Sequence, residues 1–248
     1  MISLQYKVTG IELPSHWIAK KLKHVLRLRK SNKNSGMKER NLLSLSYGNI
    51  VRKDIESSEG LVPASFEGYQ IVEPGDIVLR LTDLQNDKRS LRQGLVKERG
   101  IVTSAYDAVY ASQGNDPEYW YYFLYALDIS KYYYSLGGGV RQSISFNDFP
   151  NDWIYSPDLP EQREIVERLK KSLFAIDSII SQIGGNRAVQ VATEGSLLSL
   201  LAKRREAVIV QAIMASSSAA HEEISDELMQ RLAAAAAGTN RDESELTE

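Results

Sequence analysis

The chain has 248 residues, a length that suits one sizeable domain with an appended element. It contains no cysteine, which excludes a disulfide framework, a thiolate zinc site and a cysteine nucleophile. The net charge of −2 is unevenly distributed: residues 1–150 carry 20 Lys and Arg against 16 Asp and Glu, whereas residues 215–248 carry 2 against 8. No signal peptide or apolar membrane span is visible, so a cytoplasmic protein without a membrane partner is expected.

Residues 1–157 predict a mixed α+β domain with many short elements. An extended run ends at Pro74-Gly75, because proline and glycine suit successive turn positions, and Ile77–Leu81 is expected to form a short apolar strand. Gly100–Thr103 is predicted to be another strand. Tyr119–Leu127 predicts a helix that begins near Pro117, since proline is tolerated in a first turn.

Residues 158–214 change to a helical pattern of the coiled-coil type. Asp158 to Glu161 has the form of a capping box, which starts a helix. Apolar residues then recur at steps of three and four, as in a heptad seam that packs on another helix. The seam consists of Val166, Leu169, Leu173, Ile176, Ile180 and Ile183. The adjacent Gly184 and Gly185 are expected to break or kink this helix.

A second apolar stripe runs from Leu197 to Ile213. Two helices with matching seams form either an antiparallel pair within the chain or one long interrupted helix that needs a second chain. Residues 215–248 are rich in Ser and Ala and then acidic, and they predict a partly disordered tail with a helix over 226–237.

The sequence lacks the motifs of common catalysts. There is neither a GxxxxGK[ST] phosphate loop nor a GxGxxG fingerprint, and Gly137–Gly139 is expected to be a flexible turn. The three histidines, His16, His24 and His221, show no metal-ligand spacing. The segment closest to the Glu-x-Lys of acidic nucleases is Glu161–Arg163, where Glu161 is expected to cap a helix. A non-catalytic protein without a cofactor or a bound metal is therefore expected.

Two basic clusters indicate a nucleic-acid ligand. Residues 20–40 hold nine Lys and Arg and one acid, Glu39, and residues 80–99 combine Lys and Arg with Thr, Gln, Asn and Ser. Lys and Arg bind phosphates, whereas Arg, Asn and Gln also pair with base edges in the major groove. The alternative for the second cluster is a solvated surface loop.

Aromatic and polar residues further along the chain extend this hypothesis. Nine of the 13 tyrosines lie between Tyr106 and Tyr134, where they either contact DNA or pack in the core. Arg141–Ser143, directly after the glycine run, forms a second polar group. The residues expected to bind double-stranded DNA are Arg80, Lys88, Arg89, Arg92, Gln93, Lys97, Tyr106, Arg141 and Gln142.

A series of short blocks resembles the specificity subunit of type I restriction-modification systems. In chain order the blocks are Leu13–Trp17, Leu42–Ser46, Tyr69–Val72, Pro74–Val78, Gly100–Tyr106, Gly139–Ile144, Leu159–Ile165, Ile176-Asp177 and Lys203–Ala207. The resemblance covers residues 13–214. It implies a target-recognition domain that reads one half of a split DNA site, and a helical spacer that binds the methylating (modification) subunits. It also implies the restriction subunits as partners and no catalysis by the chain itself.

The chain departs from this family in copy number. The usual member contains two recognition domains and two helical regions, whereas this sequence has one of each. The chain is therefore a half-subunit that forms a homodimer, a half that pairs with a second half-subunit, or an inactive remnant. A homodimer would require a palindromic split target, and the seam from Val166 to Ile183 is the expected pairing surface.

Two hypotheses of other classes compete with DNA recognition. One is a helical assembly or inhibitor protein that binds methylating subunits without reading DNA. The other is a catalytic nuclease or methyltransferase fragment, which would bind a divalent metal or S-adenosylmethionine. The base sequence that is read does not follow from these residues.

Overall fold

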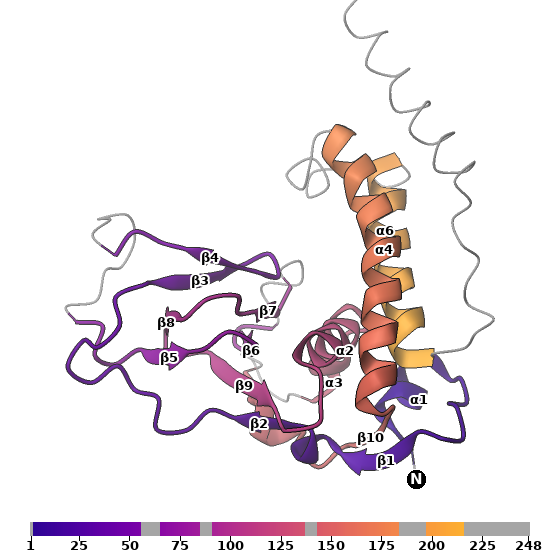
Figure 1. Ribbon diagram of the computed structural model, residues 1–248, viewed down its shortest axis with the longest axis horizontal. Helices are drawn as coiled ribbons and strands as arrows, with labels where there is room; N and C mark the ends of the chain where they lie inside the picture. The colour runs from indigo at the N-terminus through magenta and orange to yellow at the C-terminus, as the bar shows by residue number, and fades with distance from the viewer. Residues whose placement is uncertain (1, 56–64, 85–90, 137–142, 184–196, 216–248) are drawn as a thin grey trace, which may run out of the picture. The chain divides into compact units, whose positions relative to one another are not determined.

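The computed structural model describes residues 2–55, 65–84, 91–136, 143–183 and 197–215 (Figure 1). The chain divides into two compact units, Met1–Arg163 and Glu164–Glu248. The first unit contains all the described strands, and the second contains only helical elements among its described residues. The predicted α+β class with following helices is confirmed.

A six-stranded sheet forms the centre of the first unit, in the order β2-β9-β6-β7-β4-β3. Its strands are β2 (Leu26–Leu28), β3 (Leu43–Ser46), β4 (Asn49–Arg52), β6 (Asp76–Leu79), β7 (Gln93–Leu95) and β9 (Asp107–Ala111). All neighbours are antiparallel except β4 and β7. Strand β6 confirms the predicted strand at Ile77, and all four of its side chains are buried.

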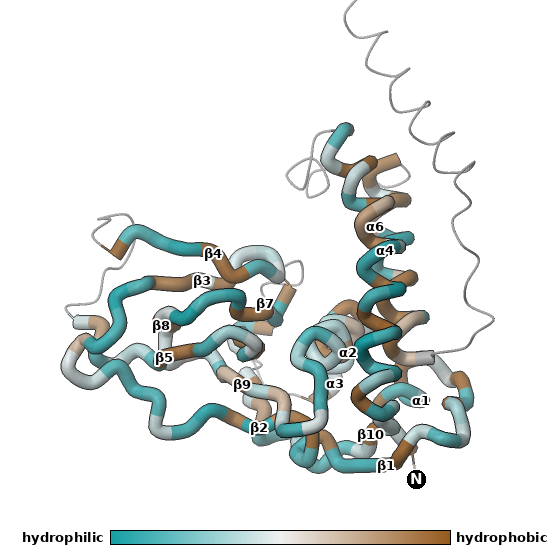
Figure 2. The backbone as a smooth tube through the Cα atoms, in the orientation of Figure 1, coloured by the Kyte–Doolittle hydropathy of each residue, from teal (hydrophilic) through white to brown (hydrophobic). Residues whose placement is uncertain are grey.

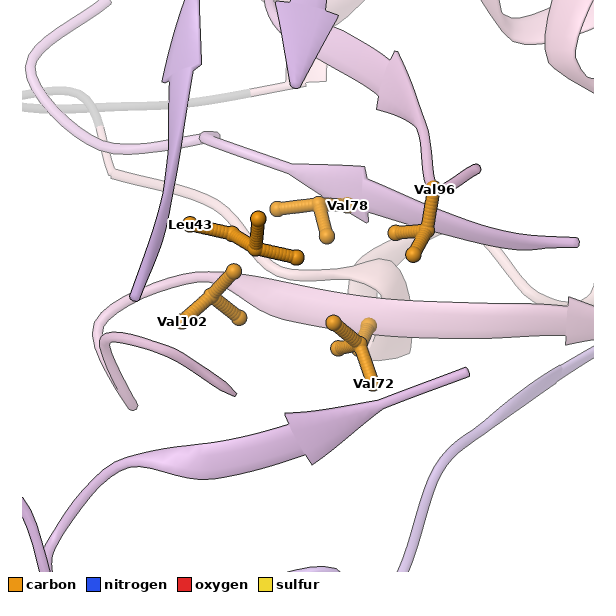
Figure 3. Packing of buried hydrophobic residues seen from close by; sticks show 6 residues of the cluster. Leu43, Val72, Val78, Val96 and Val102 are labelled. Atoms are coloured by element: carbon orange, nitrogen blue, oxygen red, sulfur yellow. The ribbon is translucent and has the colours of Figure 1, made fainter. Parts of the chain in front are cut away.

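Two smaller antiparallel sheets complete the strands of this unit. Strand β5 (Gln70–Val72) pairs with β8 (Gly100–Val102), and β1 (Ile18–Lys21) pairs with β10 (Trp153–Ser156). Five side chains, four from β3, β5, β6 and β8 and one from the residue that follows β7, point toward one another (Figure 3). They are Leu43, Val72, Val78, Val96 and Val102. This cluster holds the β5–β8 pair to one face of the large sheet.

The opposite face of the sheet packs against α2 (Pro117–Ile129), which contacts β6, β7 and β9. The Asp116 side chain accepts hydrogen bonds from the backbone N–H groups of Glu118 and Tyr119, both at 3.0 Å, and Pro117 occupies the first turn. This confirms the predicted helix start. The shorter helices of this unit are α1 (Leu4–Thr9), η1 (Leu22–His24), α3 (Tyr132–Leu136) and η2 (Phe146–Asp148).

The predicted capping residue starts α4 (Leu159–Ile183), a helix that crosses from the first unit into the second. The Asp158 carboxylate accepts from the Glu161 backbone N–H at 2.9 Å, as predicted. The Glu161 side chain instead accepts from Trp17 Nε1 at 3.0 Å and meets His16 Nε2 at 3.0 Å. Glu161 therefore fixes the segment before β1 to the first turn of α4.

Helix α6 (Leu197–Val210) runs antiparallel beside α4 and continues into a π-helical turn, η3 (Gln211–Ala215) (Figure 1). Ile176, Ile180 and Leu201 belong to one apolar cluster, and Arg205 Nε donates to Asp177 Oδ1 at 2.8 Å. The alternative of an antiparallel pair within the chain is the correct one. Figure 2 shows the resulting alternation of apolar and polar residues along both helices.

The heptad seam is covered within a single chain. Val166, Leu169, Leu173, Ile176 and Ile180 are at most 4% exposed, and the Ile183 side chain lies outside the described residues. This burial corrects the expectation that the seam is a homodimer surface, because an apolar stripe already covered cannot also face a second chain. The predicted break at Gly184-Gly185 and the acidic tail also lie outside the described residues.

Candidate nucleic-acid interface

A concave surface of about 720 Å³ lies along β2, an edge strand of the six-stranded sheet. We call it the basic groove. Its lining residues are Lys23, His24, Leu26, Arg27, Leu28, Arg29, Lys30, Tyr110, Phe146, Asn147, Pro150 and Asn151. Four of these are Lys or Arg and none is acidic, so the groove attracts anions.

Three of the four cations face solvent. Lys23, Arg27 and Lys30 are exposed, whereas Arg29 is half-buried and paired with Asp76. The Arg29 guanidinium also lies 5.1 Å from the centre of the Tyr110 ring, and its hydrogen bonds to Asp76 raise its pKa above the ordinary value. The other five basic residues of the 20–40 cluster, Lys20, Lys21, Lys33, Lys38 and Arg40, do not line the groove.

The sheet register brings several predicted residues to one end of the sheet. Leu79, the last residue of β6, pairs with Gln93 at the start of β7 and with Asp107 at the start of β9. We call this the Arg80 end, because Arg80 follows Leu79 and its backbone N–H donates to Arg92 O at 2.7 Å.

A later segment of the chain closes over the same end. The Ile144 backbone N–H donates to Leu81 O at 2.9 Å, and the Phe146 N–H donates to Asp107 Oδ2 at 2.6 Å. Burial raises the pKa of the Asp107 carboxyl. Phe146 also lines the basic groove, so the groove and the Arg80 end adjoin through η2.

Four of the nine residues predicted to bind DNA lie outside the described residues: Lys88, Arg89, Arg141 and Gln142. Two described residues close to these segments in the sequence, Leu91 and Ile144, both lie beside the Arg80 end of the sheet. Arg80 is half-buried there. Tyr106 directly precedes β9 and packs partly against the Val78 cluster.

Lys97 lies apart from these residues. It is exposed, but it follows Val96, whose backbone oxygen accepts from the Gly75 N–H at 2.9 Å. Gly75 precedes β6, so Lys97 belongs to the opposite end of the sheet from Arg80.

Arg92 and Gln93 are fully buried, at 0% exposure. Arg92 Nη1 donates to Thr82 O at 3.0 Å, and the Arg92 backbone N–H donates to Asp128 Oδ2 at 2.7 Å. These bonds hold the end of β6 and α2 to β7. This burial corrects the expectation that both side chains contact DNA. The residue types alone could not show it, because a polar residue at the start of a buried strand and one in an exposed loop contribute equally to composition.

No described group of three or more His, Asp or Glu side chains is arranged to hold a metal ion. Among the described helices, none is both long and apolar enough to cross a membrane. The predicted DNA-binding residues did not include those of the basic groove. The cluster of basic residues in 20–40 indicates part of this surface. The groove forms only where residues 23–30 meet residues 146–151, and a contact between segments so far apart in the chain has no local sequence signal.

No protein-family model matches the chain, and no curated protein matches it. It is similar to the solved HsdS subunit from Thermoanaerobacter tengcongensis, with a TM-score of 0.42, 16% identity, and coverage of 85% of this chain and 48% of that one. It is also similar to the type I restriction-modification S subunit from M. genitalium, with a TM-score of 0.43, 14% identity, and coverage of 77% and 46%.

A third similar chain comes from a structure that concerns complex assembly and conformational transition of the type I R-M system. Its TM-score is 0.46 and its identity is 17%, with coverage of 83% of this chain and 47% of that one. The chain thus spans about half the length of each of the three. Two of the three, the M. genitalium S subunit and the chain from the complex-assembly structure, are described as parts of type I restriction-modification systems.

Proposed function

We propose that the chain is a non-catalytic DNA-recognition subunit of a type I restriction-modification system. It directs the modification and restriction subunits to a split target. The observation that carries this proposal is the basic groove, where Lys23, Arg27 and Lys30 face solvent on a concave surface without an acidic residue in its lining. The order of the sequence blocks supports the family role.

The groove suits the phosphate backbone of double-stranded DNA. A duplex carries about one negative charge per 1.7 Å of its axis, and each phosphate neutralised by Lys or Arg releases counterions. Arg29 is oriented by its bidentate pair with Asp76, which leaves the three exposed side chains to meet phosphates. Contacts of this kind position a protein on DNA without selecting a sequence.

Base reading is assigned to the Arg80 end. Arg80, Lys88, Arg89, Arg141 and Gln142 are the proposed base-contacting residues, with Tyr106 beside them and Lys97 as a separate phosphate contact. Arginine and glutamine pair bidentately with base edges in the major groove. The meeting of Leu81 and Ile144 at the Arg80 end supports a shared reading surface for these segments.

The helix pair α4–α6 is proposed to bind the modification and restriction subunits. Its seam is covered within the chain, so this contact uses its outward face, where Phe174 is 76% exposed. A homodimer, or pairing with a second half-subunit, would likewise use a surface other than the seam.

The test compares two double variants that remove equal charge. Arg27→Ala with Lys30→Ala takes two cations from the groove, and Lys33→Ala with Lys38→Ala takes two exposed lysines from the same unit outside it. DNA affinity is measured by fluorescence anisotropy over a series of salt concentrations. The slope of log affinity against log salt should fall by about two for the groove variant, from about 0.9 per phosphate contact, and by less for the control.

Equal slopes in the two variants would overturn the assignment of the groove. Absence of DNA binding by the unaltered chain, alone and with a modification subunit, would overturn DNA recognition. Binding of that subunit without DNA binding would favour the helical assembly or inhibitor protein.

A further inference from the structure

The β3–β4 hairpin has one face that turns toward the core and one face that turns away from it. In an antiparallel pair, directly opposed residues share a face. The pair Leu45 and Ile50 faces the core. The alternating pairs Ser44–Val51 and Ser46–Asn49 therefore face away from it, and Asn49 and Val51 are exposed. The outward face is thus made of small or uncharged side chains that permit close approach.

The hairpin tip is firmly held. Tyr121 Oη donates to the Gly48 carbonyl oxygen at 3.3 Å. Gly48 lies so close to Leu91 that an added Cβ would be 2.8 Å from Leu91 Cδ1. Leu91 leads into the start of β7, so these contacts fix the tip at the Arg80 end of the sheet. Behind the tip, β4 meets β7 at a single pair, Asn49 with Leu95, so most of β4 has only β3 as a paired neighbour (Figure 1).

Tyr47 at this tip adopts a conformation that its residue type disfavours. Its φ is +47° and that of Gly48 is +78°, the positive values that a two-residue type I′ hairpin turn requires. Asn, Asp and Gly are the residues that normally occupy the first of these positions. A tyrosine there is strained, and the residue is 55% exposed, so burial of the side chain does not account for the strain. Backbone strain at a residue with an exposed side chain indicates a functional role for that side chain.

We propose that the β3–β4 hairpin is a specificity-determining ribbon that enters the DNA major groove. This rests on the proposed DNA-recognition function and adds residues that the sequence prediction did not include. The major groove of B-DNA admits a two-stranded β-ribbon. The Asn49 amide pairs bidentately with an adenine edge, and Ser44 and Ser46 hydrogen-bond base edges beside it.

Tyr47 contacts the bases at the deepest point of the ribbon through its ring. Asn49 Nδ2 donates to the Tyr47 carbonyl oxygen at 3.2 Å, which orients the amide next to the tip in the absence of DNA. The exposed amide exchanges this bond for a base edge on binding. The hairpin thus supplies sequence discrimination, whereas the basic groove supplies affinity for phosphates.

The test uses Asn49→Ala, Tyr47→Gly and Tyr47→Phe, with Tyr6→Ala as the matched control. Tyr6 is also an exposed tyrosine, at 48%, but it lies on α1, outside the six-stranded sheet. Each protein, together with its modification subunit, selects from a randomised double-stranded DNA library, and its melting temperature is measured. Asn49→Ala should reduce discrimination at one base position by about five- to 150-fold, with the other positions of the motif retained.

Tyr47→Gly should lower affinity for the selected motif while its melting temperature stays equal or rises, because glycine relieves the positive φ. Tyr47→Phe, which keeps the ring, should retain the affinity of the unaltered chain. The inference is overturned if the unaltered chain selects a motif and neither Asn49→Ala nor Tyr47→Gly changes selection or affinity. It is also overturned if Tyr47→Gly loses affinity and thermal stability together. If the unaltered chain selects no motif, the proposed function itself fails.

Discussion

Arg29 and Asp76 form a bidentate pair in which Nε lies 2.5 Å from Oδ2 and Nη2 lies 2.7 Å from Oδ1. The pair joins the end of edge strand β2 to β6 across the intervening β9, and the Arg29 guanidinium stacks on Tyr110 of that strand. Asp76 is 1% exposed and also accepts from the Glu73 backbone N–H at 2.8 Å. The basic groove therefore depends on a carboxylate buried beneath it.

Asp76→Ala should destabilise the protein by about 2 to 4 kcal/mol, because it leaves Arg29 and the Glu73 N–H without their acceptor. This loss of stability is smaller than for a fully buried ion pair, because the Arg29 side chain is partly exposed to solvent. Chemical denaturation measures the effect. Glu98→Ala, which breaks an exposed pair with Arg52, should change stability little. Similar losses in both variants would contradict the structural role of Asp76.

Gly100→Ala should destabilise the protein by about 1 to 3 kcal/mol. A Cβ at Gly100 would lie 2.6 Å from the Asn41 backbone oxygen and 2.6 Å from Leu43 Cδ1, so the β3–β8 contact would have to open. Gly68→Ala is the control, since no atom lies within 4 Å of its added Cβ. Thermal unfolding of both variants measures the difference, and a stable Gly100→Ala protein would show that this packing is wrong.

Asp107→Asn should remove one pH-dependent contribution to stability. Burial raises the pKa of Asp107 above its ordinary value of 3.8, so the folded chain holds this proton more tightly than the unfolded chain. The contribution of Asp107 to stability therefore falls as pH rises from about 3.8 to the folded pKa, and it is constant above that. The variant should gain thermal stability relative to the unaltered chain across this window. Parallel melting temperature profiles would contradict the burial of this carboxyl.

Ile180→Ala and Leu201→Ala should each destabilise the helix pair by about 2 to 4 kcal/mol, because each empties space in the cluster between α4 and α6. Phe174→Ala on the outward face is the control and should have almost no effect. Circular dichroism during thermal unfolding reports the loss. Full stability of both core variants would favour a seam that is covered by a second chain.

The elements that local sequence signals predict correctly are those with a complete pattern in one segment. The apolar run at Ile77 forms β6, Gly100 opens β8, and Asp116 with Pro117 starts α2. Strand β2 has no such signal, because its position in the sheet depends on pairing with β9, which lies about 80 residues away. Strand pairing of this kind depends on contacts that no local window contains.

The residues of the candidate site also could not all be predicted from local sequence. Arg80 and Arg92 belong to one polar stretch of the sequence, yet Arg80 is half-buried at the sheet end whereas Arg92 is fully buried beside Thr82. Composition cannot separate the two, because a fully buried arginine that donates to backbone carbonyls and a partly exposed arginine are the same residue type. The strain at Tyr47 is likewise a property of the backbone and has no sequence signature.

The most direct test of DNA recognition is selection from a randomised double-stranded DNA library by the chain in complex with its modification subunit. We predict that the unaltered chain enriches one defined split motif. The double variant Arg27→Ala with Lys30→Ala should recover less DNA but enrich the same motif, since phosphate contacts carry no sequence information. Recovery of DNA without any enriched motif, or no recovery by the intact complex, would contradict sequence-specific DNA recognition by this chain.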